Sequence, residues 1–389
     1  MQYRMLGNTG IEVSVIGFGT EHLTDPRKAV VSVVSEAIDA GVNYFDLLFS
    51  APEYREHYGA AFRGKRDAVV IAGHLGNAYV DGQSITTHDP ALCETAFHDL
   101  LARLRIDAVD VLMLQFVDDP DDYARVTGPG GILEMARRFK EQGKARAIGM
   151  SSHMTPVSLD AVQSGLIEVL MFSINPAFDR MPGYLPRLDA LLKAARPERE
   201  TEAIHGPDAR KALYHACRSR GVGVVVMKAY GAGYLLKPAQ SHPLTPVHCL
   251  QYALDQPGVA TVVPGMKNVE ELRAALHFLD ASPEERDYSA VLANSQWQMR
   301  GVCMYCNHCL PCPAGIDVAD TLRLIDAARQ GITPAIRQAY RQLATDASTC
   351  TACGSCADRC PFQVDVVAKM REGAAAFSSC GGRVIGSRG

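Results

Sequence analysis

The sequence of 389 residues predicts an α/β fold, a closed barrel of parallel strands followed by a small cysteine-rich domain. Three observations lead to this prediction. Short apolar runs alternate with amphipathic stretches eight times, the alternation stops near residue 281, and eight of the twelve cysteines lie between residues 303 and 360. Strands that alternate with helices form a parallel sheet, and eight such units close into a (β/α)8 TIM barrel.

The elements of the barrel follow in chain order. The stretch LGNTGIEVS predicts an opening hairpin, and segments 27–41 and 131–143 carry apolar residues at helical spacing. The barrel is expected over residues 1–280, with its active site at the carboxyl ends of the strands, where the loops converge. The eight predicted strands are residues 15–20, 43–47, 68–75, 108–116, 146–152, 168–175, 223–230 and 260–266.

Polar residues end several of these strands and are expected to ring the mouth of the barrel. Asp46 and His74 end neighbouring strands, so we expect them to pair. A carboxylate beside an imidazole favours the protonated ring and fixes its tautomer, which would make the pair a proton donor near neutral pH. A hydrogen-bonded wall residue is the structural alternative for His74. The six strand-end residues are Asp46, His74, Gln115, Ser151, Ser152 and Asn175.

Further candidates lie in the loops after the strands. Tyr54 is expected either to reach the mouth from its loop as a proton donor or to pack there, and the sequence favours neither. His57 and Tyr58 are expected to begin the next helix, with Tyr58 packing. Three other residues near strand ends are expected mainly to pack or to support the site: Glu21, His22 and His153.

A glycine turn opens the last helix of the barrel, at Gly265, Met266, Lys267 and Asn268. Free N–H groups and the positive end of the helix dipole favour an anion at such a turn, and Lys267 adds a charge. The turn therefore predicts a phosphate-bearing ligand, which could be a nicotinamide dinucleotide, a flavin or a sugar phosphate.

The cysteines form two runs, CMYCNHCLPCP and CTACGSCADRCP. The second has the C-x2-C-x2-C-x3-C-P spacing in which three thiolates bind one iron–sulfur cubane and the fourth binds a second cubane. Two runs that exchange their last cysteine predict two [4Fe–4S] clusters, and two structural zinc sites are the alternative. The predicted ligand sets are Cys303, Cys306, Cys309 and Cys360 for one cluster, and Cys350, Cys353, Cys356 and Cys312 for the other. Cys93, Cys217 and Cys249 fall in helical patterns and are expected to be buried apolar side chains.

Around the clusters, residues 281–302 are expected to connect the domains. If helical, at about 1.5 Å per residue, they would span roughly 30 Å and could return to the mouth. The cluster domain is expected over residues 303–371, with helices in 316–331 and 334–346, and the tail 372–389 is expected to be poorly ordered. The long loop 176–207 within the barrel is expected to be functional, as a lid or a substrate wall, or else mobile.

Composition excludes several classes of partner. A net charge of −4 with 21% charged residues gives no field for binding nucleic acid, and no apolar run approaches the roughly 20 residues of a membrane span. The amino terminus has no apolar signal segment, and cysteine spacing of this kind is typical of metal ligation in a reducing compartment. We therefore expect a soluble, cytoplasmic protein.

The segments LGNTGIEVSVIGFGT, AIDAGVNYFD, GKARAIGMSS and VPGMKNVEEL resemble the aldo/keto reductase superfamily in order and spacing. The cysteine domain resembles an alpha-helical dicluster ferredoxin domain, so the whole chain is similar to iron–sulfur aldo/keto reductase-like oxidoreductases. The resemblance implies carbonyl reduction with NAD(P)H by an Asp, a Tyr, a Lys and a His. Asp46 keeps its place, whereas Ala51, His74 and Gln115 stand at the other three positions.

The resemblance also implies a nicotinamide site. Polar residues after the fifth strand would hold the carboxamide, and the turn into the last helix would hold the adenosine phosphate. The residues at these positions are Ser151 and Ser152, and Gly265, Met266, Lys267 and Asn268.

Taken together, these features predict an oxidoreductase that couples one-electron transfer through two clusters to redox chemistry of a small molecule at the mouth of the barrel. Nicotinamide transfers hydride whereas clusters transfer single electrons, so a flavin, an external ferredoxin or another electron donor, or a substrate that accepts two sequential electrons is expected to join them. The alternatives are an NADP(H)-dependent carbonyl reductase with structural clusters, and a non-enzymatic redox sensor or electron-transfer subunit.

Overall fold

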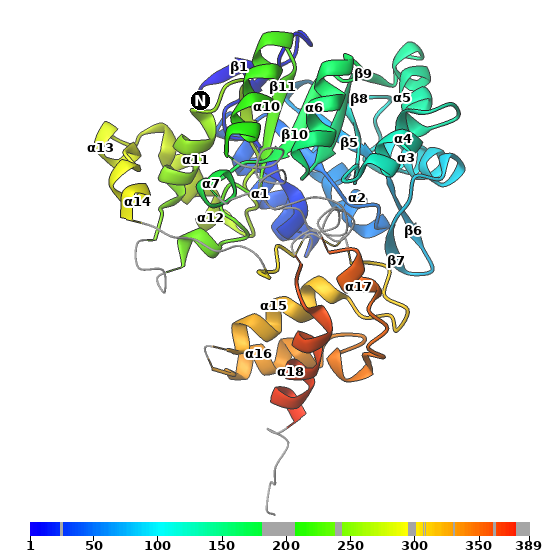
Figure 1. Cartoon of the computed structure of the whole chain (residues 1–389), viewed down its shortest axis with the longest axis vertical. Helices are drawn as coiled ribbons and strands as arrows, with labels where there is room; N and C mark the ends of the chain where they lie inside the picture. The colour runs from blue at the N-terminus through cyan, green and yellow to red at the C-terminus, as the bar shows by residue number, and fades with distance from the viewer. Residues whose placement is uncertain are drawn as a thin grey trace, which may run out of the picture. The chain divides into compact units, whose positions relative to one another are not determined.

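The computed structural model describes residues 1–23, 26–180, 207–237, 243–294, 301–305, 307, 309–329, 331–360 and 363–378. The chain forms two compact units, Met1–Gln298 and Met299–Gly389, each of which is described by itself (Figure 1). Most of the predicted lid loop, residues 181–206, and Cys306 lie outside the described residues. Within the described residues, no helix has the length and apolar character needed to cross a bilayer.

The first unit is a nearly closed barrel of eight parallel strands, each at one of the eight predicted runs. Its first and last strands meet through isolated parallel bridges that join Ile16 to Val262 and Gly19 to Gly265. The predicted eight-stranded α/β barrel is therefore confirmed. Its strands, in order around the barrel, are β3 (Phe18–Gly19), β4 (Tyr44–Leu47), β5 (Val70–Leu75), β8 (Val109–Leu114), β9 (Ala145–Ser152), β10 (Val169–Ser173), β11 (Gly223–Met227) and β12 (Val259–Val262).

Helices cover the outside of the barrel (Figure 1). The two predicted helices at 27–41 and 131–143 are present as α1 and α5. The large helices are α1 (Arg27–Asp39), α2 (Pro52–Ala61), α3 (Pro90–Leu104), α5 (Ile132–Glu141), α6 (Thr155–Ser164), α10 (Pro207–Arg220), α11 (Pro246–Leu254) and α12 (Val269–Leu276), with the shorter α4 (Pro120–Thr127) and α7 (Pro176–Arg180) after β8 and β10.

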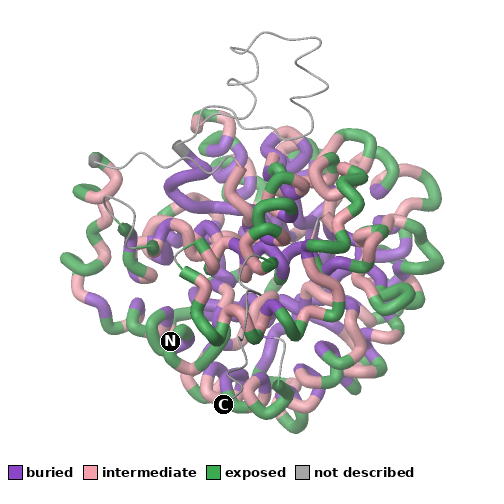
Figure 2. Tube along the Cα trace, turned by 90° about the horizontal axis from the view of Figure 1, so that it is seen from below, coloured by how far each residue is buried: buried purple, intermediate pink, exposed green. Residues whose placement is uncertain are grey.

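The apolar side chains form two layers of core. The inner layer fills the barrel with alternate residues of the strands, such as Val70, Ala72, Val111 and Met113. The predicted opening hairpin, β1 (Tyr3–Met5) and β2 (Glu12–Ser14), contributes Val13 to this layer. The outer layer lies between strands and helices, and Figure 2 shows the buried positions gathered inside the unit. Cys93, Cys217 and Cys249 are fully buried, as predicted.

A second antiparallel hairpin, which the sequence analysis did not predict, follows β5 directly. It consists of β6 (Asn77–Val80) and β7 (Gln83–Thr86). Gly76 begins it with a φ of 116°, and a Cβ at this position would lie 2.6 Å from the Gln115 carbonyl oxygen. The side-chain amide of Asn77 donates to the Leu48 carbonyl at 3.2 Å, which ties the hairpin to the neighbouring loop.

Part of the predicted connecting segment packs as helix on the barrel unit. It contains α13 (Pro283–Arg286) and α14 (Ser289–Asn294). The Arg286 guanidinium donates to the Phe278 carbonyl at 2.8 Å, and the Tyr288 hydroxyl donates to Asp255 at 2.9 Å. Residues up to 294 therefore extend the barrel unit instead of forming a free linker.

The second unit is a small bundle with α15 (Val318–Ala328), α16 (Pro334–Arg341), α17 (Ser355–Asp358) and α18 (Val366–Ser378). The two helices predicted between the cysteine runs are present as α15 and α16. The expectation of poor order is wrong for residues 372–378, which continue α18. Gly373 is buried against Ile325, and Phe377 stacks on Tyr340 with ring centroids 3.7 Å apart, so packing holds this end of the helix.

Candidate functional site

Side-chain alternation identifies the residues that point into the mouth of the barrel. Residues two apart on a strand share a face, and the inner face is marked by Tyr44 on β4 and Ala72 on β5. Asp46 and His74 follow these residues by two and therefore face inward. By the same alternation Gln115 follows Met113 and faces inward at the end of β8.

Asp46 and His74 are brought together as expected from their neighbouring strands. The His74 Nε2 atom lies 2.7 Å from the Asp46 Oδ1 atom, and the two residues are only 2% and 7% exposed. The other ring nitrogen, Nδ1, is buried and has no hydrogen-bond partner among the described residues. A buried ring nitrogen of this kind costs free energy unless a ligand or water satisfies it, so Nδ1 could accept or donate a hydrogen bond to either.

Gln115 stands where the resemblance places a histidine, and it is held in place from two directions. Its Oε1 atom accepts from the Asn77 side-chain amide at 2.5 Å, and its backbone carbonyl lies 2.9 Å from His88 Nε2. The β6–β7 hairpin and the residues just before α3 thus hold Gln115 in place at the mouth. Sequence analysis missed Asn77 and His88, because their roles depend on the unpredicted hairpin.

Two more imidazole–carboxylate pairs lie on the loops after β5, β8 and β9. His153 Nδ1 is 3.1 Å from Asp118 Oδ2, and the His153 backbone N–H donates to Asp118 Oδ1 at 2.6 Å. His88 Nδ1 is 3.6 Å from Asp122 Oδ1. Burial, the largest single influence, raises the pKa of Asp122, but hydrogen bonds with His88 and Asp119 and the electrostatic influence of His88 and Arg125 together outweigh it, so the pKa is lowered. Three imidazoles, each beside a carboxylate, therefore stand near the ends of these strands.

The structure does not bring the Tyr54 hydroxyl to the Asp46 carboxylate. Tyr54 lies in the first turn of α2, not in a loop, and its hydroxyl hydrogen-bonds to Thr20, whose own hydroxyl donates to the Asp46 backbone carbonyl. Tyr54 belongs to the outer core layer, and burial raises its pKa well above the ordinary value. Ala51 is the residue that precedes α2, and Tyr58 packs as expected, donating to the Leu23 carbonyl at 2.8 Å.

Ser151, Ser152 and Asn175 lie at the ends of their strands, as predicted, but with different surroundings. Ser151 is buried at the end of β9. The Ser152 hydroxyl donates to Asp118 at 3.1 Å and accepts from the Met154 N–H, so it organises its own loop. Asn175 is fully buried, and its side-chain amide donates to the Lys228 carbonyl at 2.9 Å.

Lys228 and Glu21 form an ion pair that sequence analysis did not predict. The Lys228 ammonium lies 3.1 Å from Glu21 Oε2, and His22 Nε2 lies 3.8 Å from the same oxygen. Lys228 directly follows β11, whereas Glu21 follows β3, so the pair reaches across the end of β12. Lys228 lies within a predicted apolar strand, and nothing in the local sequence indicated a partner 207 residues away.

The predicted phosphate turn is largely occupied by its own groups. The Lys267 N–H donates to the Glu271 carboxylate at 2.8 Å, and the Glu271 N–H donates to the Asn268 side chain at 2.8 Å. Met266 is fully buried in the core and Gly265 is covered by the His22 ring, so neither offers a surface to a ligand. The exposed Lys267 side chain remains as the one group of the predicted set suited to a phosphate.

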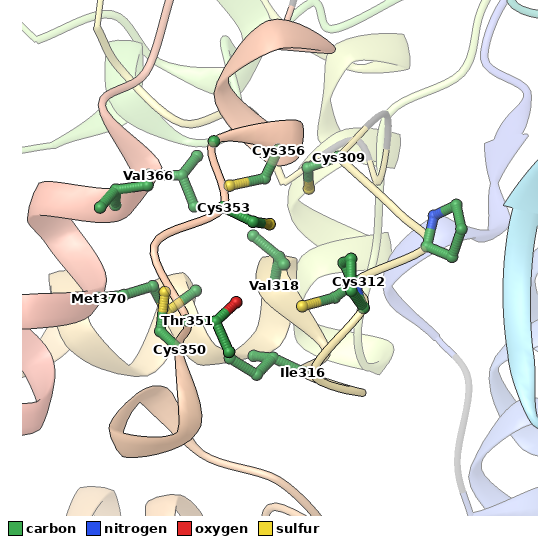
Figure 3. A pocket seen from close by; sticks show the side chains of 14 residues that line it. Cys309, Cys312, Ile316, Val318, Cys350, Thr351, Cys353, Cys356, Val366 and Met370 are labelled. Carbon is green, nitrogen blue, oxygen red and sulfur yellow. The ribbon is translucent and has the colours of Figure 1, made fainter.

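The second unit contains a cavity lined by cysteines from both runs. The cavity itself encloses about 20 Å³, and about 370 Å³ of space in and around it, open solvent included, is free of protein atoms. Figure 3 shows Cys309 and Cys312 entering from one segment and Cys350, Cys353 and Cys356 from another. No three His, Cys, Asp or Glu side chains in the described part of the chain lie close enough to hold a single metal ion. The cysteines stand around the cavity instead of meeting at one point.

Hydrogen bonds join the two cysteine runs beside this cavity. The Arg359 guanidinium donates to the carbonyls of Cys309 and Pro311 at 3.2 and 2.9 Å. Because Arg359 directly precedes Cys360, the end of the second run is tied to the first run. Apolar residues complete the wall of the cavity, among them Ile316, Val318, Val366 and Met370.

Residues 15–178 match the profile of the Aldo/keto reductase family. This part of the barrel is similar to that family of oxidoreductases. The chain is 27% identical over 298 residues to the uncharacterised oxidoreductase YqkF of Bacillus subtilis, covering 72% of this chain and 92% of that protein. It is 24% identical over 317 residues to L-galactose dehydrogenase of Arabidopsis thaliana, covering 70% and 86% of the two chains.

Solved structures of aldo-keto reductases share the fold of this barrel. The aldo-keto reductase AKR11C1 of Bacillus halodurans superposes with a TM-score of 0.58 at 22% identity, covering 75% of this chain and 95% of that one. The putative aldo-keto reductase PA4992 of Pseudomonas aeruginosa gives a TM-score of 0.52 at 22% identity, with coverage of 71% and 96%. The match in fold extends over nearly the whole of both relatives.

Similarity to the aldo/keto reductase family points to NAD(P)H, the cofactor that this family implies. The residues present fit that cofactor in part. Lys267 offers a charge for its phosphate end. At the reacting end Asp46 remains, but no phenol stands at Ala51 and His74 replaces the amine, so the family's means of protonating a carbonyl oxygen is missing from these positions.

Proposed function

We propose that this aldo/keto reductase-like protein is an iron–sulfur oxidoreductase whose second unit holds two [4Fe–4S] clusters. Redox chemistry of a small molecule takes place at the barrel mouth, where Asp46 and His74 manage the proton. The cysteine cavity is the observation that carries the proposal, because cysteines from two distant runs converge on one apolar hollow.

The donor set of the cavity suits an iron–sulfur cluster. Thiolates are the ligands of such clusters, and each binds a separate iron, so they stand apart around the cubane. Cys312 faces the same hollow as Cys350, Cys353 and Cys356, which is the set predicted by exchange of the last cysteine. When bound, such a cluster supplies or accepts one electron at a time.

His74 is suited to deliver the proton that a reduction requires. Negative charge builds on a molecule as electrons are added, and a positioned acid lowers the barrier by neutralising it. Asp46 holds one ring nitrogen at 2.7 Å and so fixes the ring orientation, while Nδ1, which has no partner among the described residues, is the atom left for a bound molecule. The pair therefore combines a fixed tautomer with an unused ring nitrogen.

The test combines metal content with turnover in an anaerobic preparation. We expect about eight irons and eight sulfides per chain. Small carbonyl compounds are then offered with reduced methyl viologen to the wild type, His74→Gln and Asp46→Asn. Loss of about 10²- to 10⁴-fold in turnover, with iron content unchanged, supports the proton role. Zinc in place of iron would refute the clusters, and wild-type turnover in both variants would refute the pair.

Similarity to the family favours one second candidate, an NADP(H)-dependent carbonyl reductase whose clusters are structural. Its test is oxidation of NADPH by small aldehydes without another electron donor. Because Ala51 provides no proton, we expect a rate near background. A robust rate that falls in Lys267→Met would favour this candidate.

A further inference from the structure

Arg359 lies where the two cysteine runs meet. Its Nη1 atom donates to the carbonyls of Cys309 and Pro311 at 3.2 and 2.9 Å. Cys309 and Pro311 belong to the first run, in which Pro311 directly precedes Cys312. Arg359 belongs to the second run and directly precedes Cys360. One guanidinium group therefore contacts, or adjoins in the chain, residues that are predicted to bind each of the two clusters.

The wall of the cysteine cavity offers little to balance negative charge. Apart from the cysteines, the described residues that line the cavity have neutral side chains, most of them apolar. Charges interact more strongly in such surroundings than in water, because less solvent screens them. Cys309 and Pro311 are themselves part of this wall. Arg359 thus places a positive charge against two of the lining residues.

The charge of Arg359 is permanent and its position is fixed. A guanidinium stays protonated throughout the pH range in which proteins are folded. Both of its acceptors are carbonyl oxygens without net charge, so these contacts hold the group without cancelling its charge. The backbone is held as well, since Arg359 ends α17 and its N–H donates to the Ser355 carbonyl at 3.3 Å. Arg359 is also partly shielded from solvent.

We propose that Arg359 raises the reduction potential of both clusters. Net charge near a cluster is one of the properties that set its potential. Reduction adds a negative charge, so a nearby cation stabilises the reduced form more than the oxidised form. This inference rests on the proposed function for the presence of the clusters. Because one residue serves both ligand sets, the two potentials depend on the same charge.

The test is a redox titration of the anaerobically prepared full-length protein, with dithionite as reductant and mediator dyes. Visible absorbance and electron paramagnetic resonance follow the reduced clusters. Arg359→Gln removes the charge but keeps N–H donors, whereas Arg359→Lys keeps the charge. Arg359→Gln should lower the equilibrium constant for reduction about tenfold, which moves the whole titration curve about 59 mV lower for a one-electron couple. Arg359→Lys should stay near the wild type.

Arg341→Gln is the matched control, because it removes an exposed arginine of the same unit, on α16, and should leave the curve unchanged. Iron analysis of each protein tests the clusters themselves, so their absence from the wild type would refute the proposed function and not be mistaken for a failure of Arg359. If Arg359→Gln loses iron, Arg359→Met takes its place.

Three results overturn the proposal. The first is an unchanged curve in a neutral variant that retains its iron, and the second is an equal shift in Arg359→Lys, which would make hydrogen bonding the cause instead of charge. The third is a shift of only half of the curve, which would confine Arg359 to one cluster. Loss of iron from both Arg359→Gln and Arg359→Met would likewise overturn it, since the residue would then only hold the two runs together.

Discussion

Replacing Cys312 by serine tests how the two cysteine runs share their ligands. Cys312 lies in the first run but lines the cavity together with three cysteines of the second run. If it binds the cluster of the second run, Cys312→Ser should damage that cluster. Cys309 lines the same cavity yet is predicted to bind the other cluster, so Cys309→Ser is the matched comparison.

The expected loss of iron follows from the ligand set of the cavity. One cubane carries about four irons, so the content should fall from about eight to about four per chain when a single cluster is lost. Serine offers a harder oxygen ligand that holds iron–sulfur clusters less well than thiolate does. The iron losses caused by two substitutions that act on the same cluster should not add. Cys312→Ser combined with Cys350→Ser should leave about four irons, whereas Cys312→Ser combined with Cys303→Ser should leave almost none.

The assay is iron and sulfide analysis with electron paramagnetic resonance of reduced, anaerobically prepared protein. Cys312→Ser and Cys350→Ser should remove the same signal, and Cys309→Ser should remove the other. The reasoning is refuted if Cys312→Ser and Cys303→Ser remove the same signal. If Cys309→Ser instead matches Cys350→Ser, then Cys309 is the ligand that crosses between the runs.

Three further predictions concern the barrel unit. Arg210 donates to the buried Asp179 at 2.6 Å, so Arg210→Met should lower the free energy of unfolding in urea by about 3–5 kcal/mol, while Arg218→Met on the exposed side of α10 should change it by less than about 0.5 kcal/mol. An equal effect of both would contradict the buried pair. Burial raises the pKa of Tyr44, Tyr58 and Tyr214, whereas unfolded tyrosines ionise near pH 10. The unfolded state therefore binds fewer protons above about pH 10, stability should fall as pH rises beyond it, and absorbance at about 295 nm should change only with the loss of circular dichroism. Burial raises the pKa of Cys93 to about 11 and of Cys217 to about 12, so iodoacetamide at about pH 8 should modify neither in the folded protein, as peptide mass spectrometry would show.

The sequence by itself determined the barrel and the pairing of Asp46 with His74. Eight apolar runs separated by amphipathic segments admit a single closed parallel arrangement, and the local period of each segment gives its type. Neighbouring parallel strands then bring their last inward residues together, and the two side chains lie 2.7 Å apart. The same local reasoning explains why the prediction that Cys93 and Cys217 are buried was correct.

Tertiary structure alone decided which groups of the predicted site remain available. The glycine turn indicated N–H groups that could donate to a ligand. The sequence did not show that the side chains of Glu271 and Asn268 accept these hydrogen bonds. Tyr54 had the right chemistry and lay near the right strand, yet the helix that contains it turns the hydroxyl toward Thr20. The direction of a side chain depends on the packing of the element that bears it, which local sequence does not contain.

Lys228 shows the same limit most clearly. Its partner Glu21 lies 207 residues earlier in the chain, and its backbone is held by Asn175 from a third strand. Contacts between residues so far apart arise only when the barrel closes, because closure brings the first and seventh strands to either side of the eighth. The sequence supplied the residues for the mouth, and closure of the sheet decided which of them meet.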